Sequence, residues 1–246
     1  MMTDRNGILI AVEGIDGAGK TTQVRMLADR LRLAGMAVVS SKEPTDGKWG
    51  QLVRQSATSG RLPLADETHA FIEDRREHVA NLVAPSLEAG KMVILDRYYY
   101  STIAYQGARG HDVQDLVDRM AAFAPTPDVV FLLDIDPALA VSRISNGRGE
   151  TPNQFERAEY LAGARQIFNR LADHDPVIRR LDATLPPDHL HAEIVAEFIN
   201  GSLKARKCAK TWDCDLFYCS ARIAGECQWF ELQERIRANP SHLVAR

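Results

Sequence analysis

The stretch that decides the fold is ILIAVEGIDGAGKTT, residues 8–22. A short apolar run leads into a glycine-rich turn that fits the pattern G-x-x-x-x-G-K-[ST] between Gly14 and Thr21. Glycines let the backbone wrap closely enough to point several N–H groups at a phosphate, and the helix expected from about Thr21 adds its positive end. Lys20 is expected to reach the terminal phosphates, and the Thr21 hydroxyl can ligate Mg²⁺. The turn therefore predicts a site for a nucleoside triphosphate.

Outward from this turn, the chain alternates strands and helices. Short apolar runs, several of them rich in valine and isoleucine as buried parallel strands tend to be, occupy residues 8–12, 36–40, 91–95, 128–135 and 177–182. The segments between them show helical spacing. This alternation predicts an α/β fold with three α/β/α layers around a five-stranded parallel sheet. With the glycine-rich turn after its first strand, it resembles a P-loop NTPase-type fold.

Three of the helical segments carry end signals. Gly35 supplies a stop for the helix that follows the turn, and Asp66 is a candidate N-cap for a helix over 65–83. Asp136 can cap a further helix, because Pro137 suits the first helical turn. These signals agree with the strand and helix boundaries inferred from the apolar pattern.

The composition is that of a globular protein. The chain has 246 residues, of which 45% are hydrophobic and 26% charged, with a formal net charge of -3. This charge gives no support to a polyanion-binding surface, so we do not expect nucleic acid as a partner. The sequence has no run of eighteen apolar residues, so it predicts no membrane-spanning helix. The first apolar run does not resemble a signal peptide. We expect a cytoplasmic protein that does not contact a membrane.

Polar residues follow two of the predicted strands, at the edge where an open parallel sheet binds its ligands. Asp96-Arg97 follows the third strand, which places Asp96 near the metal and Arg97 near phosphate; a surface salt bridge is the alternative. Glu43-Pro44 follows the second strand, where an ordinary loop turn is the alternative. The sequence thus offers a second, cationic site beside the first.

Phosphoryl transfer fits this arrangement better than a switch GTPase. A guanine-reading N-K-x-D follows none of the second, third or fourth predicted strands, whereas a transferase needs cations for an anionic acceptor. Phe71 and Arg75 lie four residues apart, so they share a helix face on which a ring and a guanidinium could hold a base. A core phenylalanine beside a solvated arginine is the alternative for this pair.

Together these residues resemble the thymidylate kinase family, P-loop kinases that phosphorylate dTMP to dTDP. The resemblance covers roughly residues 7–200, and the stretch from Asp96 to Gly107 separates this family from adenylate and guanylate kinases. The motifs are, in order, GIDGAGKTT, KEPTDG, FIEDRREHV, DRYYYSTIAYQGARG, PDVVFLLDIDPALAVSRI and LDAT.

The resemblance implies a role for each matched residue. Phe71 would stack on thymine, Arg75 would donate to its exocyclic oxygen, and Tyr105 would crowd out a 2′-hydroxyl. ATP would be held by Gly14, Ile15, Asp16, Gly17, Ala18, Gly19, Lys20, Thr21 and Thr22, with Asp182, Ala183 and Thr184 around adenine. Mg²⁺ would bind Thr21 and Asp96. The dTMP site would comprise Glu43, Pro44, Phe71, Arg75, Arg97, Tyr98, Ser101, Thr102, Tyr105 and Gln106. The catalytic set would be Lys20, Asp16, Asp96 and Arg97 with a lid arginine.

The lid arginine is assigned by what the glycine-rich turn lacks. Some family members carry this cation in the turn, where Gly17 stands here. The sequence therefore resembles the members that carry it in the lid loop, about residues 143–156, with Arg148 as first candidate and Arg143 as second. Two loop features depart from the family: Lys42 replaces an arginine, and Thr45-Asp46 replace glycines.

A second compositional unit follows the kinase-like region. We expect a kinase domain over residues 1–200 and an extension over 201–246 that contains the cysteines of the chain: Cys208, Cys214, Cys219 and Cys227. Their spacing does not match common zinc modules, so zinc or an iron–sulfur cluster, buried thiols, and disulfides all remain open.

Three functional hypotheses follow from the sequence. The first is a dTMP kinase, and the resemblance implies that it is a homodimer. The second is a kinase for another, modified pyrimidine monophosphate, which the altered loop at Lys42 allows. The third is a nucleotide-binding regulatory protein that acts through its C-terminal extension. The intact set of Lys20, Thr21, Asp96 and Arg97 favours an enzyme.

Overall fold

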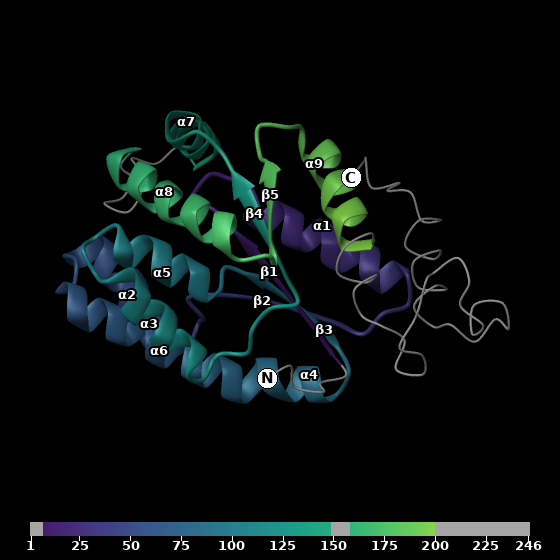
Figure 1. The fold of residues 1–246 in the computed structure, drawn as a ribbon, viewed down its shortest axis with the longest axis horizontal. Coiled ribbons are helices and arrows are strands. Elements are labelled where there is room, and N and C mark those ends of the chain that lie inside the picture. Colours follow the sequence, from purple (N-terminus) through teal and green to yellow (C-terminus); the bar gives the residue numbers. More distant parts are fainter. Residues whose placement is uncertain (1–6, 149–157, 200–246) are drawn as a thin grey trace, which may run out of the picture.

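The computed structural model describes residues 7–148 and 158–199, which form three layers (Figure 1). The middle layer is a parallel sheet in the order β2-β3-β1-β4-β5. Its strands are β1 (Ile8–Glu13), β2 (Val38–Lys42), β3 (Met92–Asp96), β4 (Val129–Asp134) and β5 (Ile178–Asp182). The predicted fold class and all five predicted strands are therefore confirmed.

The central strands are buried, as their continuous apolar runs indicate. β1 and β3 are buried along their whole length, and β4 is buried up to Leu133. The edge strands β2 and β5 are partly exposed. Residues of β1 and β3 pair from Ile8 with Met92 to Val12 with Asp96, so both strands end at the same edge of the sheet. The loops that leave this edge carry the polar residues of the candidate site.

Helices cover both faces of the sheet. α1 (Lys20–Leu33) and α9 (Pro187–Glu197) lie on one face, while the other is covered by α5 (Tyr99–Gly107), α8 (Ala158–His174) and a pair formed by α2 (Lys48–Ser59) and α3 (Leu64–His78) (Figure 1). The remaining helical segments are the π-turn η1 (Val79–Val83), α4 (Ala84–Glu88), α6 (Val113–Ala121) and α7 (Pro137–Arg148).

Two of the three predicted helix-end signals are confirmed. Gly35 follows α1 with φ 83°, and the carboxylate of Asp136 accepts the N–H of Ala138 at 2.9 Å before α7. The prediction for Asp66 is wrong, because α3 begins at Leu64 with Pro63 at the N-cap. Proline fixes φ at the N-cap position. Asp66 lies in the first helical turn, where its negative charge interacts favourably with the positive end of the helix dipole.

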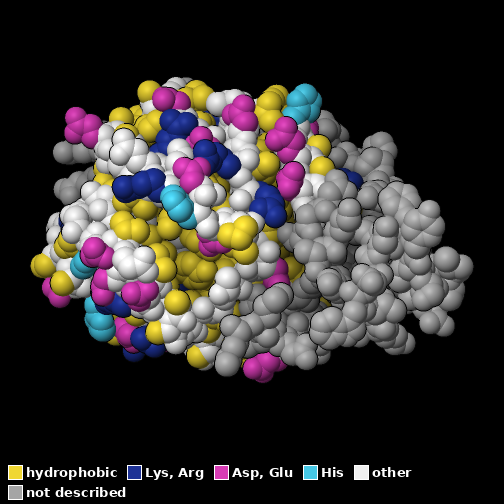
Figure 2. All heavy atoms as spheres, in the orientation of Figure 1, with side chains coloured by type: hydrophobic (Ala, Val, Ile, Leu, Met, Phe, Trp, Pro, Cys, Tyr) yellow, Lys and Arg dark blue, Asp and Glu magenta, His cyan; other side chains and the backbone are white. Residues whose placement is uncertain are grey.

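The surface on the side seen in Figure 2 carries both signs of charge interspersed, with apolar side chains gathered near the middle. On this face, Lys and Arg side chains lie next to Asp and Glu side chains.

Candidate active site

The glycine-rich turn joins β1 to α1 in a conformation that requires glycine. Gly14, Gly17 and Gly19 have φ values of 137°, 84° and 93°, a region that other L-residues rarely adopt. A Cβ on Gly17 would lie 2.4 Å from the carbonyl oxygen of Ala140, and one on Gly14 would lie 2.5 Å from that of Leu133. At Gly14 and Gly17 the turn therefore packs directly against backbone, whereas Gly19 is required by its positive φ alone.

Lys20, the first residue of α1, folds back over this turn. Its Nζ donates to the carbonyl oxygen of Ile15 at 2.8 Å, and the residue is only 6% exposed. Burial and, after it, the charge of Arg97 lower the pKa of Lys20 to about 8. A phosphate in the turn would replace the weak carbonyl partner with a stronger anionic one.

Asp96 and Thr21 meet at the same end of the sheet. Asp96 is the last residue of β3, and its Oδ2 accepts the hydroxyl of Thr21 at 2.5 Å. Both side chains offer oxygen ligands beside the phosphate-binding turn. Mg²⁺ prefers such oxygens, and it is commonly held by one or two protein ligands together with phosphates and water. The two residues therefore fit a Mg²⁺ site.

Arg97 follows β3 in an unusual backbone conformation. It is the non-glycine residue with positive φ, 70°, among those described. Its guanidinium forms an ion pair with Asp16 of the turn and donates to the hydroxyl of Ser101 at 3.1 Å. Burial alone would lower the pKa of Arg97, but Asp16 and the other acidic groups around it outweigh burial and raise that pKa. Arg97 is thus a permanent cation.

Glu13, the last residue of β1, is a buried acid beside these cations. Its Oε1 accepts the N–H of Tyr98 at 2.8 Å, and its Oε2 accepts the hydroxyl of Ser101 at 2.6 Å. Burial raises the pKa of Glu13 to about 7, although these hydrogen bonds and Arg97 oppose the shift. Glu13 therefore fixes the start of α5 and, through Ser101, the guanidinium of Arg97.

A cavity of about 620 Å³ joins the turn to these charged groups. Five cationic side chains line it, so it suits two anionic ligands: Lys20, Lys42, Arg54, Arg97 and Arg143. Its lining brings together most of the predicted residues: Asp16, Gly17, Gly19, Lys20, Thr21, Thr22, Glu43, Pro44, Phe71, Asp96, Arg97, Ser101, Thr102, Tyr105, Gln106 and Arg143.

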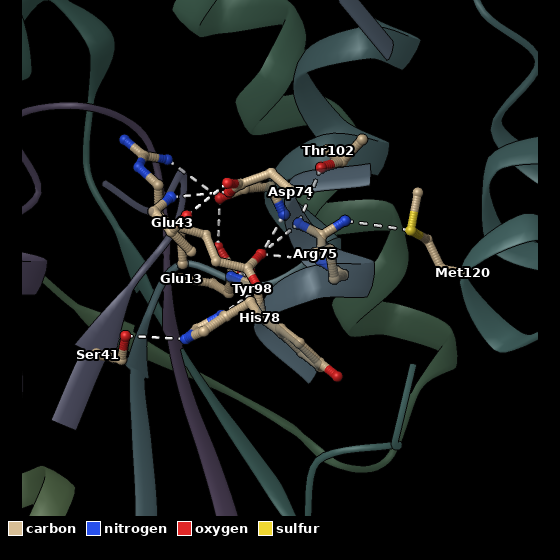
Figure 3. A network of polar contacts seen from close by, with 12 residues as sticks. Glu13, Ser41, Glu43, Asp74, Arg75, His78, Tyr98, Thr102 and Met120 are labelled. Atoms are coloured by element: carbon tan, nitrogen blue, oxygen red, sulfur yellow. Dashed lines mark hydrogen bonds and ion pairs between the residues drawn. The ribbon is translucent and has the colours of Figure 1, made fainter. Parts of the chain in front are cut away.

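Glu43 and Thr102 of the cavity lining belong to a network of buried polar residues (Figure 3). The carboxylate of Glu43 accepts two hydrogen bonds from Arg75, at 2.8 and 2.6 Å, and contacts Nδ1 of His78 at 2.9 Å. Arg75 also donates to the hydroxyl of Thr102 at 3.1 Å and contacts the sulfur of Met120. Despite burial, the charge of Arg75 keeps the pKa of Glu43 below its ordinary value.

Comparison with known proteins agrees with this geometry. The family model described as thymidylate kinase matches residues 12–194. The chain belongs to the thymidylate kinase family. It is 50% identical over 190 residues to a thymidylate kinase of Xanthomonas euvesicatoria pv. vesicatoria (strain 85-10), an alignment that covers 73% of this chain and 83% of that protein.

Two further relatives carry the same name. The thymidylate kinase of Xylella fastidiosa (strain M12) is 52% identical over 178 residues, covering 72% of this chain and 80% of that protein. The thymidylate kinase of Desulfotalea psychrophila (strain LSv54 / DSM 12343) is 45% identical over 197 residues, covering 80% of this chain and 96% of that protein.

The structure gives a local reason for the two departures from the thymidylate kinase pattern. Thr45 caps the loop after β2, because its N–H and hydroxyl both donate to Asp74 of α3, at 2.8 and 2.6 Å. Asp46 pairs with Arg54 at 3.1 Å and with Lys42 at 3.7 Å. Polar contacts to α2 and α3 therefore hold this loop where the family has glycines.

The residues predicted around adenine lie beside the cavity without lining it. The carboxylate of Asp182 accepts the N–H of Thr184 at 2.8 Å, and Arg143 donates to the carbonyl of Ala183 at 2.8 Å. Arg143 thus connects this loop to the cavity, which it lines. Arg148 ends α7, and its side chain lies outside the described residues, as does most of the lid loop.

Other predicted residues also lie off the cavity wall. Tyr98 is fully buried, its hydroxyl donates to the carbonyl of Pro125 at 3.2 Å, and its ring lies 5.5 Å from the guanidinium carbon of Arg75. The predicted residues that do not line the cavity are Gly14, Ile15, Ala18, Arg75, Tyr98, Asp182, Ala183 and Thr184.

The sequence analysis missed two polar residues of the cavity lining, Arg54 and Tyr160, and the apolar residues Val53, Ala57 and Ile144. Arg54 of α2 donates to the carbonyl of Pro44 at 2.9 Å, and Tyr160 of α8 donates to the carbonyl of Tyr105 at 3.0 Å. The helical spacing of Val53 and Ala57, which also line the cavity, was a usable signal for the inward face of α2. Tyr160 lies near the start of its helix and had no local signal.

The four cysteines lie outside the described residues, so the structure does not address the alternatives for them. Within residues 7–148 and 158–199, no group of three or more His, Cys, Asp or Glu side chains is arranged to hold a metal ion. Among the described helices, none has both the length and the apolar character needed to cross a membrane.

Proposed function

We propose that the chain transfers the γ-phosphoryl group of ATP to dTMP, giving dTDP and ADP. The observation that carries this proposal is the placement of two anion sites in one cavity. Lys20 and Thr21 lie at the turn, and Arg97 lies across from them at the end of β3. An acceptor phosphate held by Arg97 would therefore face the terminal phosphate of the donor.

The proposed mechanism depends on positioning and charge. Lys20 and Arg97 would stabilise the charge that develops on the transferring group and its neighbours during in-line transfer, and Arg143 or the lid residue Arg148 would add to them. Mg²⁺ held by Thr21 and Asp96 would neutralise negative charge on the donor phosphates. Exclusion of water from the closed cavity would limit hydrolysis of ATP.

The walls of the cavity support a pyrimidine deoxynucleotide as acceptor. Phe71 offers a ring for stacking, and Ser101, Thr102 and Gln106 of α5 offer polar contacts. Tyr105 is fixed because its hydroxyl accepts the N–H of Asp16 at 3.0 Å. A ring held in this way would occupy the space of a 2′-hydroxyl and so favour a deoxyribose.

Three further assignments are part of the proposal. Residues 1–200 act as the kinase domain, the active form is a homodimer, and the enzyme works in the cytoplasm. These rest on the resemblance and on the expected location of nucleotide metabolism. The extension over 201–246 is proposed as a separate unit.

The test is a coupled assay with Mg·ATP and a panel of dTMP, dUMP, dCMP, dGMP and AMP. We expect dTMP to give the highest kcat/KM. The variant Lys20→Met serves as the negative control, and its kcat should fall by about a thousandfold or more. A panel in which another monophosphate is preferred, or in which dTMP stimulates no ATP turnover, would contradict the proposal.

A further inference from the structure

Thr102 and Gln106 form a polar stripe on the cavity wall. They lie four residues apart on α5, so they share one face of this helix, and both line the cavity. Each is buried: Thr102 is 3% exposed and Gln106 is 0% exposed. Behind each of them lies an arginine that no proposed catalytic step uses directly.

Arg109 lies behind Gln106. Its Nη1 donates to Oε1 of Gln106 at 3.4 Å and forms an ion pair with Glu67, while its Nη2 donates to the carbonyl of Leu62 at 3.3 Å. The carboxylate of Glu67 is fully buried and is also paired with Arg61, at 3.2 Å. Two arginines from different segments therefore share one buried carboxylate, which holds Arg109 in place.

The arginine determines which way round the Gln106 amide lies. A guanidinium has only donors, so the amide oxygen must face Arg109 and the amide nitrogen must face away from it. Among the described residues, Nε2 of Gln106 is buried without any hydrogen-bond partner. A buried donor without a partner is unfavourable unless a ligand supplies the acceptor. The Gln106 amide N–H is therefore a donor available to a ligand in the cavity that Gln106 lines.

Arg75 has the same relation to Thr102, one helical turn earlier. Its Nη2 donates to the Thr102 hydroxyl at 3.1 Å, and it is held by the buried carboxylate of Glu43. Because the hydroxyl oxygen accepts from a group that cannot itself accept, the hydroxyl proton is left for another acceptor. Thr102 and Gln106 are thus both oriented as donors by a buried arginine–glutamate pair.

We propose that Arg109 is a specificity-determining positioning residue, which orients the Gln106 amide so that the cavity wall donates hydrogen bonds to the base. Arg75 has the matching effect on Thr102. This inference rests on the proposed function, because it takes a pyrimidine base as the group that meets this wall. A wall of donors suits a base edge with carbonyl oxygens, as in thymine, and disfavours an exocyclic amino group at the same position, as in cytosine.

The Gln106 amide has two orientations that differ by a rotation of 180°. With Arg109 in place, rotating the Gln106 amide by 180° would bring its NH₂ group against guanidinium donors, which is unfavourable. Without the guanidinium both orientations become accessible, so the same side chain could accept a hydrogen bond from an amino group. Discrimination between the two bases should then weaken by roughly tenfold, the value of one mismatched buried hydrogen bond.

The experiment compares Arg109→Gln with Arg61→Gln. Both changes remove one of the two arginines that pair with Glu67, and they differ in their second partner: Arg109 donates to Gln106, whereas Arg61 donates to the hydroxyl of Tyr160 at 2.8 Å. The readouts are kcat/KM for dTMP, dUMP and dCMP, together with calorimetric affinities of the three monophosphates. We expect Arg109→Gln to reduce the preference for dTMP over dCMP roughly tenfold, while the ratio of dTMP to dUMP stays unchanged because both bases present the same carbonyls.

The conservative variant Arg109→Lys keeps a donor-only cation behind Gln106, so it should retain most of the preference. Equal loss of preference in Arg61→Gln and Arg109→Gln would overturn the inference, since it would point to a general effect of disturbing Glu67. An unchanged preference in folded Arg109→Gln would also overturn it. If the wild type binds dTMP over dCMP but does not phosphorylate dTMP, the proposed function fails and the inference stands. If the wild type binds both equally, the inference fails.

Discussion

At the scale of single residues, the site depends on charged groups whose protonation the fold controls. Lys20 is the clearest case, because burial and Arg97 lower its pKa to about 8. Below this pH the free enzyme carries the ammonium group that a triphosphate needs. Above it the group becomes neutral, and the donor site loses a charge.

This predicts a specific pH dependence. We expect kcat/KM for ATP to decline above an apparent pKa near 8, with a limiting slope of about one decade per pH unit. At saturating ATP the decline should move to higher pH, because bound phosphates favour the charged lysine. Steady-state kinetics between pH 6 and 10 would check it. A flat kcat/KM profile across this range would contradict the assignment.

Arg97 allows a second prediction at this scale. Arg97→Lys keeps the charge but loses the planar fork that binds a phosphate through two donors. The KM for dTMP should rise roughly ten- to hundredfold, while the KM for ATP should change little. Arg119→Lys, a change at a partly exposed position of α6, is the matched control. A similar increase for both substrates would argue against an acceptor role for Arg97.

The residues of the site were partly predictable from sequence. The turn, Asp96-Arg97 and Phe71 could be placed because each follows a strand or repeats on a helix. The pairing of Glu67 with Arg109 could not, because it joins residues 42 positions apart and neither belongs to a local pattern. Burial of Arg75 behind the wall was equally hidden, since sequence spacing gives a helix face but not its depth.

At the scale of elements, the loop after β2 is held by its contacts with α2. A Cβ on Gly50 of α2 would lie 2.0 Å from the carbonyl oxygen of Thr45 in this loop. That oxygen belongs to backbone, which cannot give way as a flexible side chain could. The same loop carries Glu43 and Pro44 into the cavity.

Gly50→Ala should therefore move the loop. We expect the free energy of unfolding to fall by about 1–3 kcal/mol and the KM for dTMP to rise, because the loop shapes the acceptor wall. Chemical denaturation and steady-state kinetics would measure both effects. Thr58→Ala, an exposed change on the same helix, is the control. Wild-type values for both quantities in Gly50→Ala would show that the packing is looser than the structure indicates.

Elements were predicted more reliably than their ends. All five strands follow from their apolar runs, because three of them are buried on both faces. The segment predicted as one helix over 65–83 instead passes into η1 and α4. Pro85 lacks an N–H group and leaves an irregular turn, in which the N–H of Ala84 bonds to the carbonyl of Val79. The apolar spacing alone does not reveal that change.

At the scale of the whole molecule, Glu13 connects the site to stability. Burial raises the pKa of Glu13 from its ordinary value of 4.5 to about 7. Between these two pH values the carboxyl group is protonated in the folded protein and ionised in the unfolded chain. The stabilisation from this group is therefore complete below 4.5 and is lost as pH rises through 7. At pH 8 the buried carboxylate costs on the order of 3 kcal/mol.

Glu13→Gln should remove most of that pH dependence. We expect the variant to be more stable than the wild type at pH 8 and to differ little from it at pH 5. Denaturant titrations at both values would measure the two differences. Glu88→Gln, an exposed change on α4, should follow the wild type at both. A variant that is destabilised equally at pH 5 and pH 8 would show that Glu13 acts through its hydrogen bonds rather than through its charge.

The layered arrangement also separates the two halves of the cavity. The triphosphate turn belongs to β1 and α1, whereas the base wall belongs to α3 and α5 on the opposite face of the sheet (Figure 1). Substitutions at Phe71, Thr102 or Gln106 can therefore alter the choice of base on one layer, whereas Ser101 and Tyr105 contact Glu13 and Asp16 and connect the wall to the phosphate site. Such a scaffold is open to evolving, or to being engineered, toward new nucleotides while it keeps the same energy source.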